Sequence, residues 1–290
     1  MPRPRLVRHA SEIGQWEMVH GEPPLALRPY IREYIGWYEH MASPLCRREL
    51  PTEIIPVIIN FGSPIRIFER DDLSRWTDVS SFATGAYDTY VLVGSAGPSG
   101  GLQINFTILG ARLFLNRPLE DLTNRVAPLD DVLGPSARRL IDALHDAPSW
   151  EERFAMVDRD VSRRLATTRA PAPEILCSWH RLVQSRGRIA ITDLVRETGW
   201  SQKHLIAKVR EQLGLGPKTL ARVLRFGRAV TLIRTNQVGR LADVALECGY
   251  YDQAHLSRDV VEFAGVSPRE LVKSLLPDFG GFEVTNPELS

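Results

Sequence analysis

Two groups of polar and basic side chains near the C-terminal end have the chemistry needed to read DNA. Gln202 and Lys203 form the first group, and Gln253, His255 and Arg258 form the second. Amide, ammonium and guanidinium groups donate hydrogen bonds to the base edges that the major groove of a duplex exposes. The role of these side chains therefore depends on whether the chain holds each group on an exposed element.

Both groups belong to a pattern that occurs twice. Seven residues of the first copy recur in the second, two of them 50 positions later and five of them 51 positions later, with Tyr251 as the extra residue. The pairs are Glu197 and Glu247, Gly199 and Gly249, His204 and His255, Leu205 and Leu256, Gly214 and Gly265, Pro217 and Pro268, and Leu220 and Leu271. A duplication of this size indicates one supersecondary motif used twice.

Each copy predicts a helix, a glycine turn and a second helix. In the first copy the apolar spacing predicts helices over residues 191–198 and 202–212, with Gly199 ending one and Ser201 capping the other. The second copy predicts helices over residues 241–248 and from residue 253 onward, capped by Asp252. A helix over residues 218–235 joins the copies, and a short helix begins at Pro268. This order is typical of helix-turn-helix units.

The tract from residue 188 to 275 closely resembles the DNA-binding domain of the AraC/XylS family of bacterial transcription regulators. The resemblance rests on residues 199–205 (GWSQKHL), 214–217 (GLGP), 225–229 (RFGRA), 248–250 (CGY), 252–258 (DQAHLSR) and 264–268 (AGVSP). Val209 and Val260 stand where the family usually has an aromatic residue, which thins the core slightly. Ala207 stands where an arginine is frequent, which indicates fewer polar base contacts from the first recognition helix.

The resemblance implies that two recognition helices enter successive major grooves about 34 Å apart. The residues expected to contact bases are Gln202, Lys203, Ile206, Gln253, Ala254, His255 and Arg258. The residues expected at phosphates, where contacts orient the protein without specifying a sequence, are Ser201, Arg210, Lys218, Arg225 and Arg240. As an alternative, His204 and His255 pack against the protein or bind a phosphate.

The charge distribution agrees with a DNA partner. Residues 175–276 contain 16 Lys and Arg against 9 Asp and Glu, a net charge of +7, whereas residues 1–174 have a net charge of −3. No apolar run approaches the roughly 20 residues that span a bilayer, and no secretory signal is recognisable. The three cysteines, Cys46, Cys177 and Cys248, lack metal spacing. We expect a cytoplasmic protein without membrane contact, and redox sensing by Cys46 is an alternative.

The N-terminal half predicts a β-rich domain followed by helices. Short β-branched or aromatic runs cover residues 34–38, 53–59, 65–68, 89–93 and 102–109. Helical periodicity follows over residues 130–145, 149–166 and 174–184. This order resembles AraC-type regulators with a cupin-like barrel and a helical hairpin. The predicted fold class is α+β: a sensor or dimerisation domain over residues 1–168, a linker over 169–173, an all-α domain of two helix-turn-helix units over 174–276, and a flexible tail over 277–290.

No residue pattern indicates an enzyme. The seven histidines are too far apart in sequence for a metal site built by spacing. The glycine-rich segment 94–101 lacks the ending of a phosphate-binding loop, so we expect a hairpin turn, and no nucleophile elbow occurs. We therefore expect no catalysis, no metal and no cofactor. The expected partners are double-stranded DNA and a small-molecule effector, with RNA polymerase and a second copy of the chain as further candidates.

Five residues in predicted strands are candidates for an effector pocket, although such residues are also ordinary core: Trp37, Tyr38, Ile58, Phe68 and Phe106. The leading hypothesis is an effector-responsive, sequence-specific transcription regulator. The alternative is an effector-independent regulator whose N-terminal domain dimerises or docks a protein partner, with residues 130–166 as a possible dimer face. A substrate-processing barrel with an attached DNA module is a third reading. An enclosed cavity favours the first hypothesis, and an exposed apolar helix face favours the second.

Overall fold

The computed structural model describes residues 4–43, 45–95, 97–235, 240–276 and 281–284. Its strands are β1 (Arg5–Ser11), β2 (Gly14–Gly21), β3 (Ile31–Met41), β4 (Cys46–Glu49), β5 (Ile54–Asn60), β6 (Ile65–Glu69), β7 (Asp72–Val79), β8 (Phe82–Thr84), β9 (Val91–Ser95), β10 (Ser99–Thr107) and β11 (Val126–Pro128). They form two antiparallel sheets with the orders β1-β2-β3-β10-β5-β8-β11 and β4-β9-β6-β7. This is the predicted β-rich N-terminal part.

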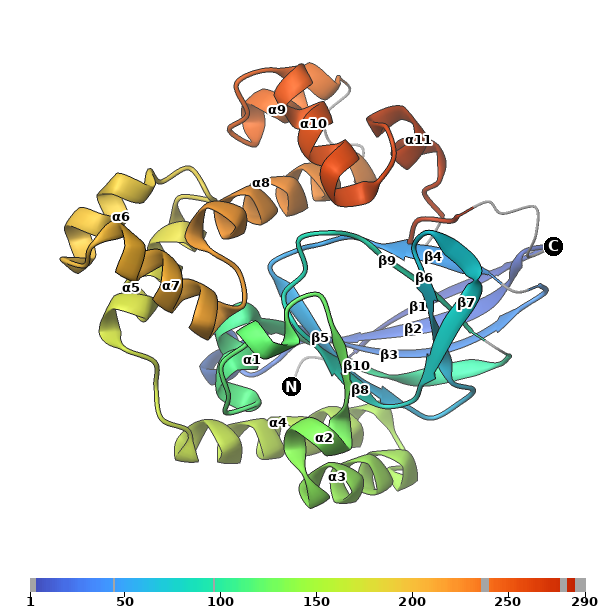
Figure 1. Cartoon of the computed structure of the whole chain (residues 1–290). Coiled ribbons are helices and arrows are strands. Elements are labelled where there is room, and N and C mark those ends of the chain that lie inside the picture. The colour runs from blue at the N-terminus through green and yellow to red at the C-terminus, as the bar shows by residue number, and fades with distance from the viewer. Residues whose placement is uncertain (1–3, 44, 96, 236–239, 277–280, 285–290) are drawn as a thin grey trace.

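The helices are α1 (Ile108–Phe114), α2 (Leu129–Leu133), α3 (Pro135–Asp146), α4 (Trp150–Thr167), α5 (Pro173–Gln184), α6 (Ile191–Thr198), α7 (Gln202–Leu213), α8 (Pro217–Arg234), α9 (Leu241–Glu247), α10 (Gln253–Ala264) and α11 (Pro268–Lys273). Figure 1 shows α2, α3 and α4 below the sheets, α5 to α7 at one side, and α8 to α11 above them. The fold class is α+β, which confirms the prediction.

Three local predictions for the N-terminal part need correction. The strand predicted over residues 102–109 ends at Thr107, whose hydroxyl caps α1 by accepting from the backbone N–H of Gly110 at 3.0 Å. The helix predicted over residues 130–145 is divided at Gly134, which has a φ of +63°. The segment 94–101 is not a hairpin turn, because β9 belongs to the smaller sheet and β10 to the larger one, so the chain crosses between sheets here.

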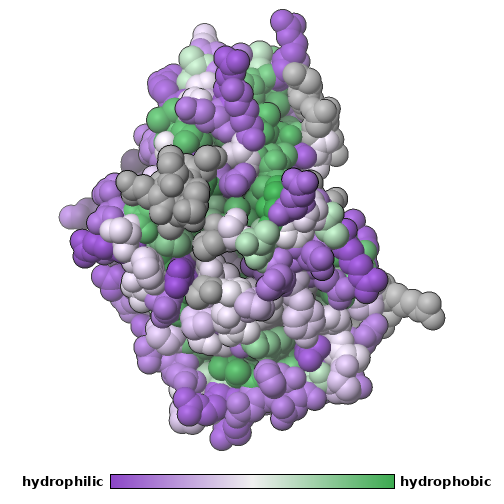
Figure 2. All heavy atoms as spheres, turned by 90° about the vertical axis from the view of Figure 1, so that its right-hand side faces the viewer, coloured by the Kyte–Doolittle hydropathy of each residue, from purple (hydrophilic) through white to green (hydrophobic). Residues whose placement is uncertain are grey.

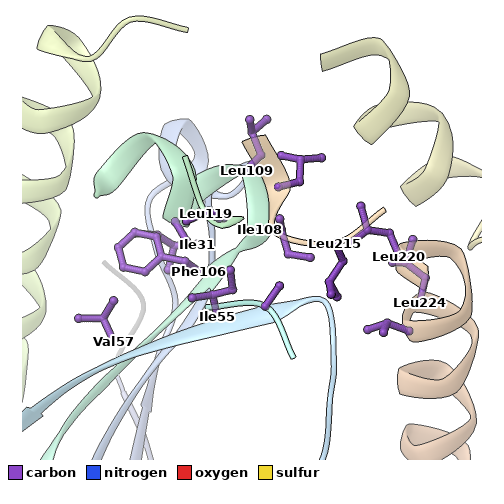
Figure 3. Close-up of a cluster of buried hydrophobic side chains, with 14 of the residues drawn as sticks. Ile31, Ile55, Val57, Phe106, Ile108, Leu109, Leu119, Leu215, Leu220 and Leu224 are labelled. Atoms are coloured by element: carbon purple, nitrogen blue, oxygen red, sulfur yellow. The ribbon is translucent and has the colours of Figure 1, made fainter. Parts of the chain in front are cut away.

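One hydrophobic cluster runs through both parts of the chain. Figure 3 shows Leu215, Leu220 and Leu224, from the start of α8 and the turn before it, approaching buried side chains of the β-rich part that include Ile108 and Leu119. All five are buried. Helix α8 also lies close to the segment before β5, since a Cβ on Gly227 would be 2.9 Å from Glu53 Oε2. The helical region is therefore packed against the β-rich part rather than suspended from it.

Candidate nucleic-acid interface

The two helix-turn-helix units, α6–α7 and α9–α10, begin and end their helices in the same way. Gly199 follows α6 with a φ of +70°, and Gly249 follows α9 with a φ of +77°, so each turn uses the left-handed conformation that glycine adopts freely. Ser201 and Asp252 each accept a hydrogen bond from the backbone N–H three positions later, at 3.3 and 2.7 Å. The duplicated sequence pattern is thus a duplicated structural unit.

An arginine from the preceding helix binds the repeated glutamate of each unit. In the first unit, Arg181 Nε and Nη2 on α5 donate to the two oxygens of Glu197 at 2.7 and 2.8 Å. In the second unit, Arg228 on α8 donates to Glu247. Hydrogen bonding to each guanidinium lowers the pKa of its glutamate below the usual range. Sequence analysis did not predict this role for either arginine, because neither belongs to the repeated pattern and they are 47 positions apart.

Arg222 on α8, the helix that joins the two units, fixes the second recognition helix, α10. Its Nε and Nη2 donate to Asp259 Oδ1 at 3.2 and 2.7 Å, and its Nη1 donates to Glu262 Oε1 at 2.8 Å. The guanidinium also lies 4.8 Å from the ring centroid of Phe263. Asp259 is only 3% exposed, so rotation of α10 would leave a buried carboxylate without this partner. The orientation of α10 is therefore set by α8.

The first recognition helix, α7, lacks this ion pair. Lys208 and Glu211 occupy the positions equivalent to Asp259 and Glu262, and they bind each other at 2.7 Å. On its buried side, α7 is held by Leu205, Val209 and Leu213. The valine that replaces the family's usual aromatic residue is fully buried, so packing holds this helix where an ion pair holds the other.

Six of the seven predicted base-contacting residues lie on exposed positions of the recognition helices. The exposed residues are Gln202, Lys203 and Ile206 on α7, and Gln253, Ala254 and Arg258 on α10. These positions follow the helical period, so each set forms one face. The structure therefore places a polar and basic face at equivalent places in both units.

The two repeated histidines pack against the aromatic residue before their helix. The ring of His204 stands edge-on to Trp200 with centroids 4.6 Å apart, and the ring of His255 stands edge-on to Tyr250 at 5.1 Å. His255 Nδ1 also accepts from the backbone N–H of Tyr251 at 3.5 Å. The expectations for these histidines were base contact, phosphate binding or packing against the protein, and the contacts in this structure match packing. The aromatic residue that occurs at both 200 and 250 is the sequence feature that could have indicated this.

The five residues expected at phosphates have different surroundings. Lys218 and Arg240 are exposed, and Ser201 is occupied as a helix cap. Arg225 Nη1 donates to the carbonyl oxygen of Gly187 at 2.5 Å, and its guanidinium lies 5.6 Å from the Tyr250 ring. In this structure Arg225 therefore joins the two helix-turn-helix units, because its partners come from the segment before α6 and from the turn of the second unit.

The exposed face of α7 borders a groove that it shares with the N-terminal part. The groove has a volume of about 790 Å³ and is lined by Glu120, Gln202, Lys203, Ile206, Ala207, Arg210 and Glu211. Arg210 Nε lies 3.6 Å from Glu120 Oε1 across it. A second space of about 300 Å³ is also lined by Gln202, Ile206 and Arg210 and reaches Asp88 and Lys218. The exposed face of α7 thus lies opposite carboxylates of the N-terminal part.

The five candidate effector residues do not meet at one place. Phe106 stacks on Phe114 with ring centroids 4.6 Å apart in the main core, whereas Phe68 belongs to a separate small cluster with Cys46. Tyr38 is 45% exposed beside Trp150. Trp37 Nε1 donates to Ser99 Oγ at 3.1 Å, and Ile58 is buried outside both clusters. A single pocket formed by all five is therefore not present.

Metal-binding clusters and membrane-spanning helices are absent from the part of the chain that the structure describes. There, no three His, Cys, Asp or Glu side chains gather in a way that could hold a metal ion, and no helix has the length and apolar character to cross a membrane. Cys46 and Cys248 are buried, and burial raises the pKa of each thiol to about 11. Because the thiolate is the reactive form, Cys46 is a poor redox sensor in this structure.

Comparison with known proteins bears on the helical region. Residues 194–274 match the family model described as "Helix-turn-helix domain". No curated protein sequence matches the chain. Among solved structures, an apo ToxT variant from Vibrio cholerae is similar at 11% identity and a TM-score of 0.48, covering 84% of this chain and 98% of that one.

Two further solved structures are similar at lower scores. Wild-type ToxT bound to an unsaturated fatty acid has 13% identity and a TM-score of 0.44, covering 80% of this chain and 96% of that one. The AraC-like transcriptional activator CuxR has 14% identity and a TM-score of 0.33, covering 76% and 83%. These likenesses are too weak to add to the assignment, which rests on the matched region and its geometry. The C-terminal region of this chain is a helix-turn-helix domain of the AraC type, the kind of domain through which transcription regulators bind DNA.

Proposed function

We propose that this protein is a sequence-specific regulator of transcription that reads two successive major-groove segments with α7 and α10. The observation that carries the proposal is the pair of exposed polar and basic faces at equivalent positions of two capped helices. A rigid helix, α8, joins the units, so the two faces keep a fixed phase along a duplex.

The two faces are not chemically equal. Arg258 on α10 suits the two acceptors of a guanine, and Gln253 suits an adenine. The position equivalent to Arg258 on α7 is Ala207, so base reading by the first unit falls to Gln202 and Lys203. We therefore propose that the half-site under α10 is the more strictly specified of the two.

The finer proposal is that a small molecule acting on the N-terminal part controls this binding. It is supported by contacts from that part to the first unit: Arg112 Nε donates to Gln212 Oε1 at 2.9 Å, and Thr123 Oγ1 donates to the carbonyl oxygen of Gly214 at 2.8 Å. A ligand that shifts α1 or the loop after it would therefore move α7.

The alternative, in which helices of the N-terminal part dock a partner, has less support. A docking face made by α3 and α4 requires exposed large apolar side chains. Within these two fully described helices, no large hydrophobic side chain is exposed; Leu140 and Ile141 are half-buried. Dimerisation through another surface and contact with RNA polymerase are compatible with the main proposal.

The test is recovery of bound fragments from a genomic DNA library by the full chain, followed by binding titrations on the enriched sequence. We expect an enriched motif with two parts separated by about one helical turn. The matched variants are Gln253→Ala, which changes a reading residue, and Arg269→Ala, which changes an exposed residue of α11. No enrichment over input, or a motif insensitive to Gln253→Ala, refutes the proposal.

A further inference from the structure

A short C-terminal segment, residues 281–284, is inserted between the helical region and the smaller sheet. Arg48 N–H donates to the carbonyl oxygen of Phe282 at 2.8 Å, and Val284 N–H donates to that of Cys46 at 2.9 Å, so the segment extends the sheet beyond β4. On its other side, Glu283 N–H donates to the carbonyl oxygen of Ser274 at 2.7 Å. The C-terminal segment is therefore joined to both parts by backbone hydrogen bonds, contrary to the expectation of a flexible tail.

Side chains reinforce this connection. Phe282 is 4% exposed and belongs to the main core, with the guanidinium of Arg234 on α8 lying 5.9 Å from its ring centroid. Val284 packs against the small cluster formed by Cys46, Phe68 and Leu92. The rest of the predicted tail, residues 277–280 and 285–290, lies outside the described residues. The side of the molecule where α11 approaches the smaller sheet is shown in Figure 2.

The segment lies beside a second contact between the same two parts. Tyr90, before β9, packs on the glycine that ends α10, since a Cβ on Gly265 would lie 2.4 Å from Tyr90 Cε1. The guanidinium of Arg48 lies 5.0 Å from the Tyr90 ring centroid. The end of the second recognition helix is thus held against β4 and β9, and the C-terminal segment closes the edge of this contact.

The arrangement that the segment stabilises is unfavourable for DNA. A recognition helix sits in a groove about 8.5 Å deep, so phosphates rise on both sides of it. Glu120 stands 3.6 Å from Arg210 beside the α7 reading face, and Asp88 borders the same face. DNA phosphates beside α7 would be repelled by these two carboxylates and would overlap the surface of the N-terminal part. Reading through both units therefore requires the helical region to move away from the N-terminal part.

We propose that the C-terminal segment is an autoinhibitory strand: it holds the helical region in a closed arrangement, and its release from β4 is a step in DNA binding. This inference rests on the proposed function. Because α8 joins the two units rigidly, holding the second unit near β4 also holds α7 against Glu120. Detachment of the segment raises the population of chains that can bind, and apparent affinity scales with that population.

The test compares the full chain with a chain ending at Leu276 and with a control ending at Val284, which keeps the segment. DNA affinity is measured on a labelled mixed-sequence duplex at low salt, and the radius of gyration is measured by small-angle scattering without DNA. We expect the chain ending at Leu276 to bind roughly tenfold more tightly and to be more expanded, because its competent fraction is larger. The control should behave as the full chain does.

A point variant keeps the test valid if the shortened chain misfolds. Glu283→Pro removes the N–H that bonds Ser274, whereas Glu283→Ala keeps it. Glu283→Pro should reproduce the gain in affinity and Glu283→Ala should not. Unchanged affinity and unchanged dimensions in both the shortened chain and Glu283→Pro overturn the inference. If none of these proteins binds DNA but the chain ending at Leu276 has a larger radius of gyration, the proposed function is refuted. The inference that the C-terminal segment holds the two parts together is then still supported.

Discussion

Arg258→Ala should weaken binding to the recognised sequence while leaving the fold intact. Arg258 is exposed on α10, and within the protein its Nε donates to the carbonyl oxygen of Ala254 at a long 3.3 Å. Alanine is the strongest helix former, so the loss of this contact changes the free energy of unfolding by less than about 0.5 kcal/mol. A change in affinity can therefore be assigned to the DNA contact.

The expected magnitude follows from the geometry of a guanidinium on a base edge. A bidentate contact to guanine contributes about 1–3 kcal/mol of discrimination, which corresponds to about 5- to 150-fold in Kd. The loss of one positive charge also weakens binding to any duplex, but by a smaller factor. Arg269→Ala provides the control for that effect, because Arg269 is an exposed arginine on α11 rather than on a recognition helix.

The assay is fluorescence anisotropy on the selected duplex and on a scrambled duplex of the same length, at one salt concentration. Arg258→Ala should raise Kd on the selected duplex and leave Kd on the scrambled one nearly unchanged. Arg269→Ala should affect both duplexes alike. If Arg258→Ala weakens both equally, Arg258 lies at the phosphate backbone, and the assignment of α10 as a base-reading helix through this residue is refuted.

Three further outcomes are expected. Binding should fall steeply with salt, with a slope near −0.9 per phosphate neutralised, and a flat salt titration contradicts the basic contacts. Arg222→Ala should lower the free energy of unfolding by about 2–4 kcal/mol in urea, because it strands the buried Asp259, and a change below about 1 kcal/mol contradicts the ion pair. Burial raises the pKa of Asp158 in the folded protein, so the folded state loses stability as pH rises above the pKa of about 3.9 that an aspartate has in the unfolded chain. The variant Asp158→Asn, which still accepts a hydrogen bond from Tyr34, should therefore be more stable than the original protein at neutral pH but not in acid. Parallel plots of unfolding free energy against pH for the two proteins would contradict this.

Local signals in the sequence were sufficient for the helical region. Ser201 and Asp252 cap their helices as predicted, and Gly199 and Gly249 have the positive φ that their place after a helix implies. These features depend on residues within one turn of each other, so spacing alone reveals them. The strands β3, β5, β6, β9 and β10 were predicted for the same reason, because each contains a short run of β-branched or aromatic residues with at least one buried position.

Features that depend on distant partners were missed. The strands β1 and β7 lie at the edges of their sheets and are mostly exposed, so they carry little apolar pattern. The Arg222 ion pair spans 37 positions and has no counterpart in the first unit. The pairing of Arg48 with Phe282 joins residues that are 234 positions apart, and no short motif marks it.

The shared hydrophobic cluster limits how the two parts can separate. Full parting would bring Leu215, Leu220 and Leu224 into water together with Ile108 and Leu119, at about 1.5–3 kcal/mol for each side chain. The carboxylates beside α7 are not part of this cluster, whereas Phe282 of the C-terminal segment is buried in it. A rotation that keeps the three leucines packed while the C-terminal segment and the carboxylates separate from their partners would therefore expose much less apolar surface than full separation.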